Sequence, residues 1–440
     1  MDAPAIPSTS EFVAVFTEAR TRTLELIADL TDEQMMGPRL PILNPLLWEI
    51  GHLAWFQEKW VLRHLGKEKP IRKDGDLLYD SARVPHDTRW DLPLPSRDET
   101  LGYMERVLHR IVERLATIKL NEQEAYFHRL ALCHEDMHAE AFLYTRQTLG
   151  HPAPQLTGVR AVPWGERRIG SPVSGDAEVP GGTFLLGATP DLPFVFDNEK
   201  WAHSVEVRAF RIARTPVTNA EFAAFVEDMG YRRRELWSET GWRWRGGEGA
   251  EHPVYWERGS AGRWYHRRFN TLCLLEDRLP VIHVNWYEAE AYCRWAGRRL
   301  PTEVEWEVAA SAEPAPSGHG LGRKKRGFPW GSDPPSPERA NLDAWALGCI
   351  EVDALPDGDS AFACRQMIGN VWEWTDTDFG PYPGFAVDPY KEYSEPWFGT
   401  HKVLRGGCWA TRSRLIRNTW RNFYTSDRRD VLAGFRTCAK

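Results

Sequence analysis

The sequence predicts an α+β protein in two parts, a four-helix bundle followed by a larger domain of short strands and long loops. Two observations predict it. Residues 1–150 carry apolar residues at helical spacing, whereas glycine, tryptophan and short apolar runs dominate the rest. A chain of 440 residues is also long enough for two or three domains. We expect a bundle over 1–150, a linker rich in Pro and Gly over 151–178, and the strand-rich domain over 179–440.

Two of the four expected helices begin at a capping box, a serine followed three residues later by glutamate. Ser8 and Glu11 open the first helix, and Ser96 and Glu99 open the third. Apolar residues at helical spacing follow each box, as the inward face of a bundle helix requires. Helices of this length favour an up-and-down bundle.

The fourth expected helix, Phe127–Gln147, carries two histidines on its apolar face. His134 and His138 are four residues apart, so their side chains point in the same direction on a helix. Such a pair commonly holds a transition metal. The alternative is two core histidines bonded to the backbone or to carboxylates.

The second expected helix, Pro45–His64, carries a third histidine. His52 stands between tryptophans on the inward side, with Glu49 and Glu58 expected to face solvent. Alone, His52 would be a core histidine. With the other two it completes a three-histidine set on two helices, which would leave positions on a metal open for water, oxygen or substrate. A structural zinc site would instead need four ligands, usually with cysteines.

A long irregular connection, Leu77–Pro95, joins the second and third helices. A loop of this length in a small bundle is often functional. The alternative is a packed crossover with surface charge. Its polar and aromatic candidates for binding are Asp80, Arg83, His86, Asp87, Arg89 and Trp90.

Composition and charge argue against several classes of protein. The formal charge of −7 argues against nucleic acid as a partner, and no run of 18 apolar residues predicts a membrane span. The first ten residues lack a targeting pattern, so we expect a cytoplasmic protein. Seven widely spaced cysteines without C-x-x-C are typical of reduced, mostly buried thiols. The 21 tryptophans indicate a domain held by large aromatic side chains, or a pocket for an organic cation.

The strand-rich domain is expected to contain few helices. We predict two, over Asn219–Met229 and Tyr287–Ala296, and the start of a third capped by Thr302.

Seven segments recur in this domain in a recognisable order: 180–187, 216–219, 280–286, 299–306, 369–374, 404–409 and 434–436. Together they resemble the formylglycine-generating-enzyme (sulfatase-modifying factor) fold, a C-type-lectin-like domain. The N-terminal part resembles a DinB-like four-helix bundle, in which His52, His134 and His138 match the metal histidines.

This order of domains resembles the ergothioneine-synthase-like sulfoxide synthases. The resemblance implies a non-haem iron(II) enzyme with O2 as co-substrate, which joins sulfur to C2 of the imidazole of hercynine (Nα-trimethylhistidine). A formylglycine generator is disfavoured because its catalytic cysteine pair is missing: Cys408 has no second cysteine after it through Arg417.

The resemblance also implies substrate residues in the segment 421–428. Asn422 would bind the hercynine carboxylate, and Phe423 would face the trimethylammonium group as a cation–π partner. Arg428 matches an arginine that binds the donor carboxylate. Plain core aromatics remain the alternative for Phe423 and Tyr424. A tyrosine between residues 379 and 393 acts as the acid in family members, and the candidates are Tyr382 and Tyr390.

Three departures from the family pattern affect the donor or imidazole side. Tyr424 replaces the acid that holds the donor amino group, Met137 replaces a glutamine, and residues 79–90 replace a loop with a donor-binding arginine. A site without that acid is not expected to take an amino-acid thiol. The selenoneine synthases fit better, because they resemble these enzymes but use a selenosugar, 1-seleno-N-acetylglucosamine. The residues expected to bind its hydroxyls are Asp80, His86, Asp87, Arg89, Trp90 and Tyr424.

The sequence therefore predicts an Fe(II)- and O2-dependent enzyme that forms a C–Se bond between hercynine and a selenosugar. The first alternative is an ergothioneine-type enzyme that forms a C–S bond with γ-glutamylcysteine or cysteine. A zinc-dependent thiol transferase of DinB type and a non-enzymatic lectin-like binding protein also remain open. The sequence does not indicate an oligomeric state.

Overall fold

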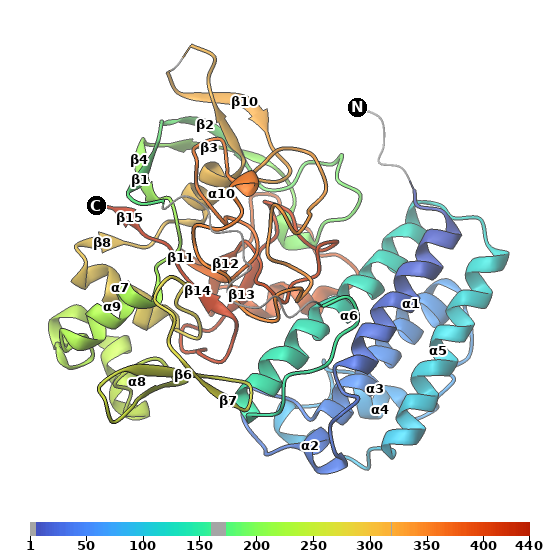
Figure 1. Cartoon of the computed structure of the whole chain (residues 1–440). Helices are drawn as coiled ribbons and strands as arrows, with labels where there is room; N and C mark the ends of the chain where they lie inside the picture. The colour runs from blue at the N-terminus through green and yellow to red at the C-terminus, as the bar shows by residue number, and fades with distance from the viewer. Residues whose placement is uncertain (1–5, 160–172, 318) are drawn as a thin grey trace. The chain divides into compact units, whose positions relative to one another are not determined.

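Long helices build the first of the two units into which the chain divides (Figure 1). The computed structural model describes residues 6–159, 173–317 and 319–440. The first unit comprises Met1–Gly158 with Asp191–Phe194, and the second comprises Val159–Pro190 with Val195–Lys440. Residues 160–172 of the linker expected over 151–178 lie outside the described residues, and the first strand already begins at Asp176.

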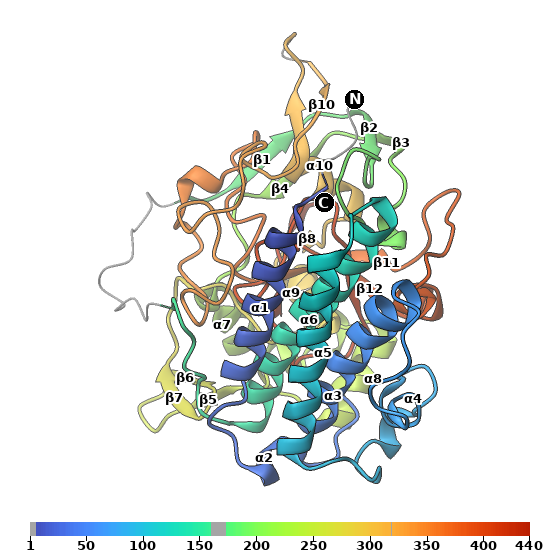
Figure 2. The same cartoon turned by 90° about the vertical axis from the view of Figure 1, so that its right-hand side faces the viewer.

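The bundle helices pack in a ring, in which α1 and α3 each contact both α5 and α6. Figure 2 shows α1, α5 and α6 running side by side along their lengths. The helices of this unit are α1 Thr9–Glu25, α2 Asp32–Met36, α3 Leu46–Gln57, α4 Gly75–Tyr79, α5 Arg97–Thr117 and α6 Glu122–Leu149.

The expected helix starts are confirmed at both capping boxes. The hydroxyl of Ser8 accepts from the backbone of Glu11, that of Ser96 accepts from the backbone of Glu99, and both glutamates bond back to the serine backbone. The fourth helix is longer than expected. It begins after Asn121, whose side chain caps it, and ends at a left-handed Gly150.

The second expected helix consists of two geometries. It is α-helical over α3 and continues as a π-helix over Glu58–Leu65. π-Helical turns are rare and occur often at functional sites. The expectation that Glu49 and Glu58 face solvent is wrong, because the side chains are 3% and 1% exposed. They lie inside because each has a polar partner, Asn44 and Tyr103 respectively.

The described part of the second unit combines short strands with four α-helices, so the α+β expectation is confirmed. A central sheet has the order β13-β12-β11-β14, and another has the order β1-β4-β15-β8. The strands are β1 Asp176–Val179, β2 Gly182–Leu186, β3 His203–Val207, β4 Phe210–Ala213, β5 Trp256–Arg258, β6 Trp264–Arg268, β7 Thr271–Leu274, β8 Arg298–Arg299, β9 Ala312–Pro314, β10 Leu321–Lys325, β11 Trp372–Asp378, β12 Lys402–Arg405, β13 Asn422–Tyr424, β14 Ala433–Gly434 and β15 Cys438–Ala439.

The helices of the second unit are α7 Asn219–Glu227, α8 Glu239–Glu248, α9 Trp286–Trp295 and α10 Glu303–Ser311. Three were expected, and Thr302 caps α10 as expected. Helix α8 was not expected, because its sequence contains three glycines and has no clear apolar face.

Large aromatic side chains fill the core of the second unit. Trp306, Trp372 and Trp374 are fully buried, as the tryptophan content predicts. All seven cysteines lie in the described residues as thiols, and all but Cys273 are buried. No helix in the described parts of the chain has the length and apolar character needed to cross a membrane.

Candidate metal centre

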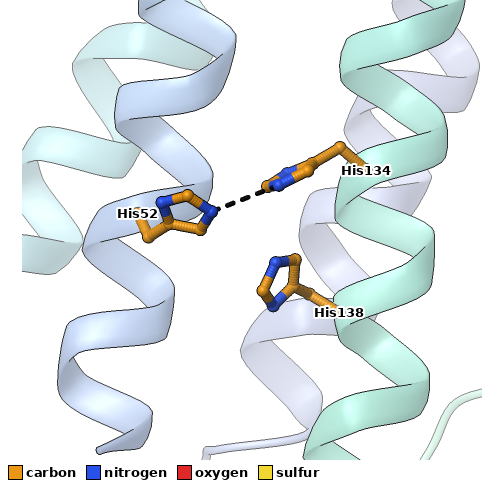
Figure 3. A group of neighbouring side chains, drawn as sticks. All are labelled: His52, His134 and His138. Carbon is orange, nitrogen blue, oxygen red and sulfur yellow. Dashed lines mark hydrogen bonds between the residues drawn. The ribbon is translucent and has the colours of Figure 1, made fainter. Parts of the chain in front are cut away.

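The three predicted histidines converge inside the bundle. His52 on α3 faces His134 and His138, which lie one turn apart on α6 (Figure 3). One ring nitrogen of each lies within 4.8 Å of those of the others. The Nε2 atoms of His52 and His134 are 3.2 Å apart. Two neighbouring ligands with bonds of 2.0–2.1 Å to one metal would be about 3.0–3.4 Å apart, so this spacing fits a shared ion.

The outer nitrogens of two rings face acceptors. Nδ1 of His52 lies 2.7 Å from the backbone carbonyl of Tyr79, at the end of α4. A carbonyl only accepts, so Nδ1 carries the proton and Nε2 keeps its lone pair for a metal. Nδ1 of His138 lies 3.4 Å from Oε1 of Glu49. Acceptors of these kinds orient metal-binding histidines in proteins.

Aromatic rings fix the planes of two imidazoles. Trp48 is stacked on His52, with ring centroids 4.8 Å apart and planes 10° apart. The ring of Phe56 is stacked on that of His134, with centroids 3.6 Å apart and planes 2° apart. These contacts leave the two rings little freedom to turn, so the nitrogens stay aimed at one point.

The protonation state of the site suits a metal. His52 and His134 are both 3% exposed. Burial, followed by the charge of His138, holds the pKa of each well below its usual range. Neutral imidazole is the form that binds metals. Within the described residues, this is the only group of three or more His, Cys, Asp and Glu side chains close enough to hold an ion. It offers three ligands, which is typical of an open, reactive site.

Arg89, from the long connection, lies behind the histidines. Its guanidinium carbon is 3.9 Å from the centre of the Trp48 ring, and Nη1 donates to Oδ1 of Asn44 at 2.5 Å. Burial lowers the pKa of Arg89 to about 10, so it stays charged at neutral pH. Its predicted role in donor binding stays a prediction.

Two further candidates in this connection, Asp80 and His86, are engaged by other parts of the protein. Asp80 is 6% exposed and lies 3.8 Å from Nζ of Lys59 and 3.5 Å from Nε of Arg83. The ring of His86 bonds the backbone carbonyl of Leu43 at 2.5 Å. Their donor-binding roles also stay predictions.

In the second unit, Phe423 belongs to an aromatic cluster. Its ring stacks on Phe379 with centroids 4.0 Å apart, while Tyr393 and His401 lie edge-on at 5.6 and 5.8 Å. Asn422 and Phe423 are consecutive residues of β13, which pairs with β12. The Oδ1 atom of Asn422 accepts from the backbone N–H of Phe423 at 2.8 Å.

Tyr424 and Arg428 lie next to that cluster in sequence and contact each other. The guanidinium carbon of Arg428 is 5.1 Å from the centre of the Tyr424 ring. Two of its nitrogens, Nε and Nη2, donate to the carboxylate of Asp430, each at 2.7 Å. The charge of Arg428 is therefore already balanced within the chain.

The two candidate acids have different surroundings. Tyr382 is 7% exposed in the apolar core of the second unit, with Arg421 at 4.1 Å from its ring centre. Tyr390 is half-buried and stacks on Tyr393 at 5.9 Å. Burial raises the pKa of Tyr382 and of Tyr393 far above the usual range. Tyr393 was not one of the two candidates named from the sequence, but it is the tyrosine whose ring contacts Phe423.

Comparison with known proteins finds a matching family for each of the two units. Residues 16–144 match the DinB superfamily, and residues 170–440 match the sulfatase-modifying factor enzyme 1-like domain. A hercynine oxygenase of Mycolicibacterium thermoresistibile is 36% identical over 99% of this chain and 96% of its own. One of Mycobacterium tuberculosis is 36% identical over 98% of both chains. The chain belongs to the hercynine oxygenase family.

Similarity to formylglycine-generating enzymes is more limited. That of Streptomyces coelicolor is 30% identical over 60% of this chain and 88% of its own. The hercynine oxygenases, by contrast, are similar over nearly the whole chain. The three-histidine group in a member of this family indicates a non-haem iron site.

Proposed function

We propose that this protein is a non-haem iron(II) enzyme that uses O2 to join the selenium of a selenosugar to C2 of the hercynine imidazole. The observation that carries this proposal is the open three-histidine group in a chain of the hercynine oxygenase family. His52, His134 and His138 would hold the iron. When bound, the iron would supply O2 activation and lower the pKa of the donor's Se–H.

The overall reaction balances. The C2–H and Se–H bonds break, and a C–Se and an Se–O bond form. O2 takes up four electrons, with one oxygen atom going to selenium and the other leaving as water. The same balance holds for a thiol donor and a sulfoxide product.

The aromatic cluster supports a quaternary ammonium substrate. A trimethylammonium group has no N–H and cannot donate a hydrogen bond. Aromatic faces can bind it through cation–π interactions in a site from which water is excluded. Phe423, Phe379 and Tyr393 form a cluster that would offer such faces to hercynine. The amide of Asn422, on the same strand, would bind the carboxylate of hercynine and orient the imidazole.

The surroundings of Arg428 support a neutral donor. Its two hydrogen bonds to Asp430 compensate its charge, so it is poorly suited to a donor carboxylate. Tyr424, in place of an acid, cannot pair with a donor ammonium group. A hydroxyl-rich sugar needs neither charge. The thiol alternative remains, because the relatives are named for hercynine and their names specify no donor.

A donor comparison tests the proposal. Metal-free protein is loaded with iron(II) without oxygen and mixed with hercynine and one donor: 1-seleno-N-acetylglucosamine, γ-glutamylcysteine or cysteine. Oxygen is then added, and products are measured by mass spectrometry. We expect product with the selenosugar. Product only with a thiol would move the assignment to an ergothioneine-type enzyme, and no product with any donor would overturn both.

One variant sharpens the comparison. Tyr424→Asp restores a carboxylate where the family has its acid, and should raise turnover of γ-glutamylcysteine relative to the selenosugar. Thr425→Ser, at the next residue in the sequence, is the matched control. It should leave the ratio of γ-glutamylcysteine turnover to selenosugar turnover unchanged.

A further inference from the structure

We propose that Glu49 is a positioning residue of the metal centre, which holds His138 by accepting a hydrogen bond from Nδ1. Asn44 and Arg89 in turn hold Glu49. This inference rests on the proposed iron site, but it concerns residues outside the three ligands.

The burial of Glu49 requires an explanation. Its side chain is 3% exposed, and a buried carboxylate costs several kcal/mol unless it is paired. Asn44 donates to Oε1 at 3.1 Å. Among the described residues no hydrogen-bond partner reaches Oε2. One amide is weak compensation for a full buried charge, so a further donor is needed.

His138 would supply that donor, at Oε1. Its Nδ1 is buried and has no hydrogen-bond partner within the described residues, and Oε1 of Glu49 lies 3.4 Å from it. The separation is at the long end for a hydrogen bond. The pairing is nevertheless complementary, because the Glu49 carboxylate can accept a hydrogen bond and Nδ1 of His138 can donate one. With the proton on Nδ1, His138 presents Nε2 to the other two rings, as His52 does.

Asn44 links this pair to Arg89. Its amide nitrogen donates to Glu49, and its amide oxygen accepts from Nη1 of Arg89 at 2.5 Å. That orientation is the one the partners require, since a carboxylate only accepts and a guanidinium only donates. The positive charge of Arg89 thereby stabilises the negative charge of Glu49.

The same arginine supports a second ligand. Arg89 lies on the face of Trp48, and Trp48 stacks on His52. The chain of contacts thus reaches His138 through a carboxylate and His52 through an indole. Glu49 is three residues before His52, so both lie on one face of α3. That spacing is the sequence signal by which Glu49 could have been found.

Metal affinity tests the proposal without turnover. Glu49→Gln keeps the shape but removes the charge. The metal-free protein is titrated with cobalt(II) and with iron(II) against a chromophoric chelator, without oxygen. Loss of such an outer carboxylate typically weakens metal binding by about 10–100-fold, and we expect that loss. The visible spectrum of bound cobalt(II) should also change, which a purely structural role would not cause.

Glu58→Gln is the matched control. Glu58 is equally buried and continues the same helix, but it accepts from Tyr103 at 2.8 Å. Its variant should bind cobalt(II) as the wild type does. Equal losses in both variants, or a Glu49→Gln affinity within twofold of wild type, would overturn the proposal.

Asn44→Ala decides the matter if Glu49→Gln does not fold, as judged by circular dichroism. It removes the clamp but leaves the carboxylate, so a smaller loss in the same direction is expected. Unchanged affinity in Asn44→Ala would then overturn the proposal. A wild-type protein that binds neither metal would instead refute the iron site itself.

Discussion

The ring of Phe56 lies parallel to the imidazole of His134, with centroids 3.6 Å apart and planes at 2°. Phe56 is 2% exposed and one turn after His52 on α3, so one helix provides both a proposed ligand and the support for another. The bundle therefore holds His52 and His134 in the geometry that the proposed metal site needs.

Replacing Phe56 by leucine tests this support. Leucine keeps most of the apolar volume but has no flat face to stack on the imidazole. Aromatic pairs contribute about 0.5–1.5 kcal/mol beyond burial, so metal affinity should fall by up to about tenfold. Chelator competition measures it. Phe16→Leu, at a fully buried ring in contact with His128, should lower stability but leave metal affinity unchanged.

Gly51 lies against the Tyr79 ring, and a Cβ atom there would approach its carbons to 2.3 Å. Tyr79 is fully buried, and its carbonyl accepts from His52. Gly51→Ala should therefore displace Tyr79, destabilise the bundle by about 1–3 kcal/mol and weaken metal binding.

Gly102→Ala is the control for that substitution. Its Cβ would meet only the tip of Arg106, at 3.4 Å, within α5. Alanine in a helix is about 0.5–1 kcal/mol more favourable than glycine, so this variant should be slightly stabilised. Urea unfolding followed by circular dichroism measures both. A stable Gly51→Ala variant with normal metal affinity would contradict the assigned role of Tyr79.

His128 predicts a pH dependence of stability. It is fully buried, and burial lowers its pKa to about 4. The unfolded chain, with a pKa near 6.5, binds the proton more readily between these values, so stability falls as the pH falls through that window. From pH 7.5 to 5.0 the loss should be about 2 kcal/mol for this group. His128→Phe should lose that much less stability over the same range in urea unfolding, and an unaltered pH dependence would contradict the assignment.

A buried ion pair ties the bundle together. Arg20 donates to Glu135 at 2.9 Å, to Gln57 at 2.8 Å and to the carbonyl of Met104 at 2.6 Å. Arg20→Met leaves the Glu135 charge uncompensated and should cost about 3–5 kcal/mol in urea unfolding. Arg232→Met, in an exposed pair with Glu251, should leave the unfolding midpoint unchanged. Similar effects of the two would show that the buried network adds no stability.

Helical spacing was sufficient to predict that the three histidines lie close together. In a helix bundle the apolar faces of the helices pack against one another, so any residue on such a face points into the core. The capping boxes were equally informative, since each involves only four consecutive residues. These are local patterns, and local patterns can be read from one sequence.

Features that depend on distant partners were not predicted. Glu49 was expected at the surface because its carboxylate is polar, whereas its partners Asn44 and His138 come from a preceding loop and another helix. The π-helical continuation after Gln57 and helix α8 also have no strong local signal. The predicted roles of Asn422, Tyr424 and Arg428 rest on resemblance and stay predictions.

Iron binding by the three histidines is tested most directly by anaerobic equilibrium dialysis of the metal-free protein against iron(II), with bound metal counted per chain. We expect about one iron per chain for the wild type and for His128→Phe, whose side chain lies on the same helix outside the site. We expect loss of that iron in His134→Ala. Equal iron in His134→Ala and the wild type, with both folded, would contradict iron binding by the three histidines.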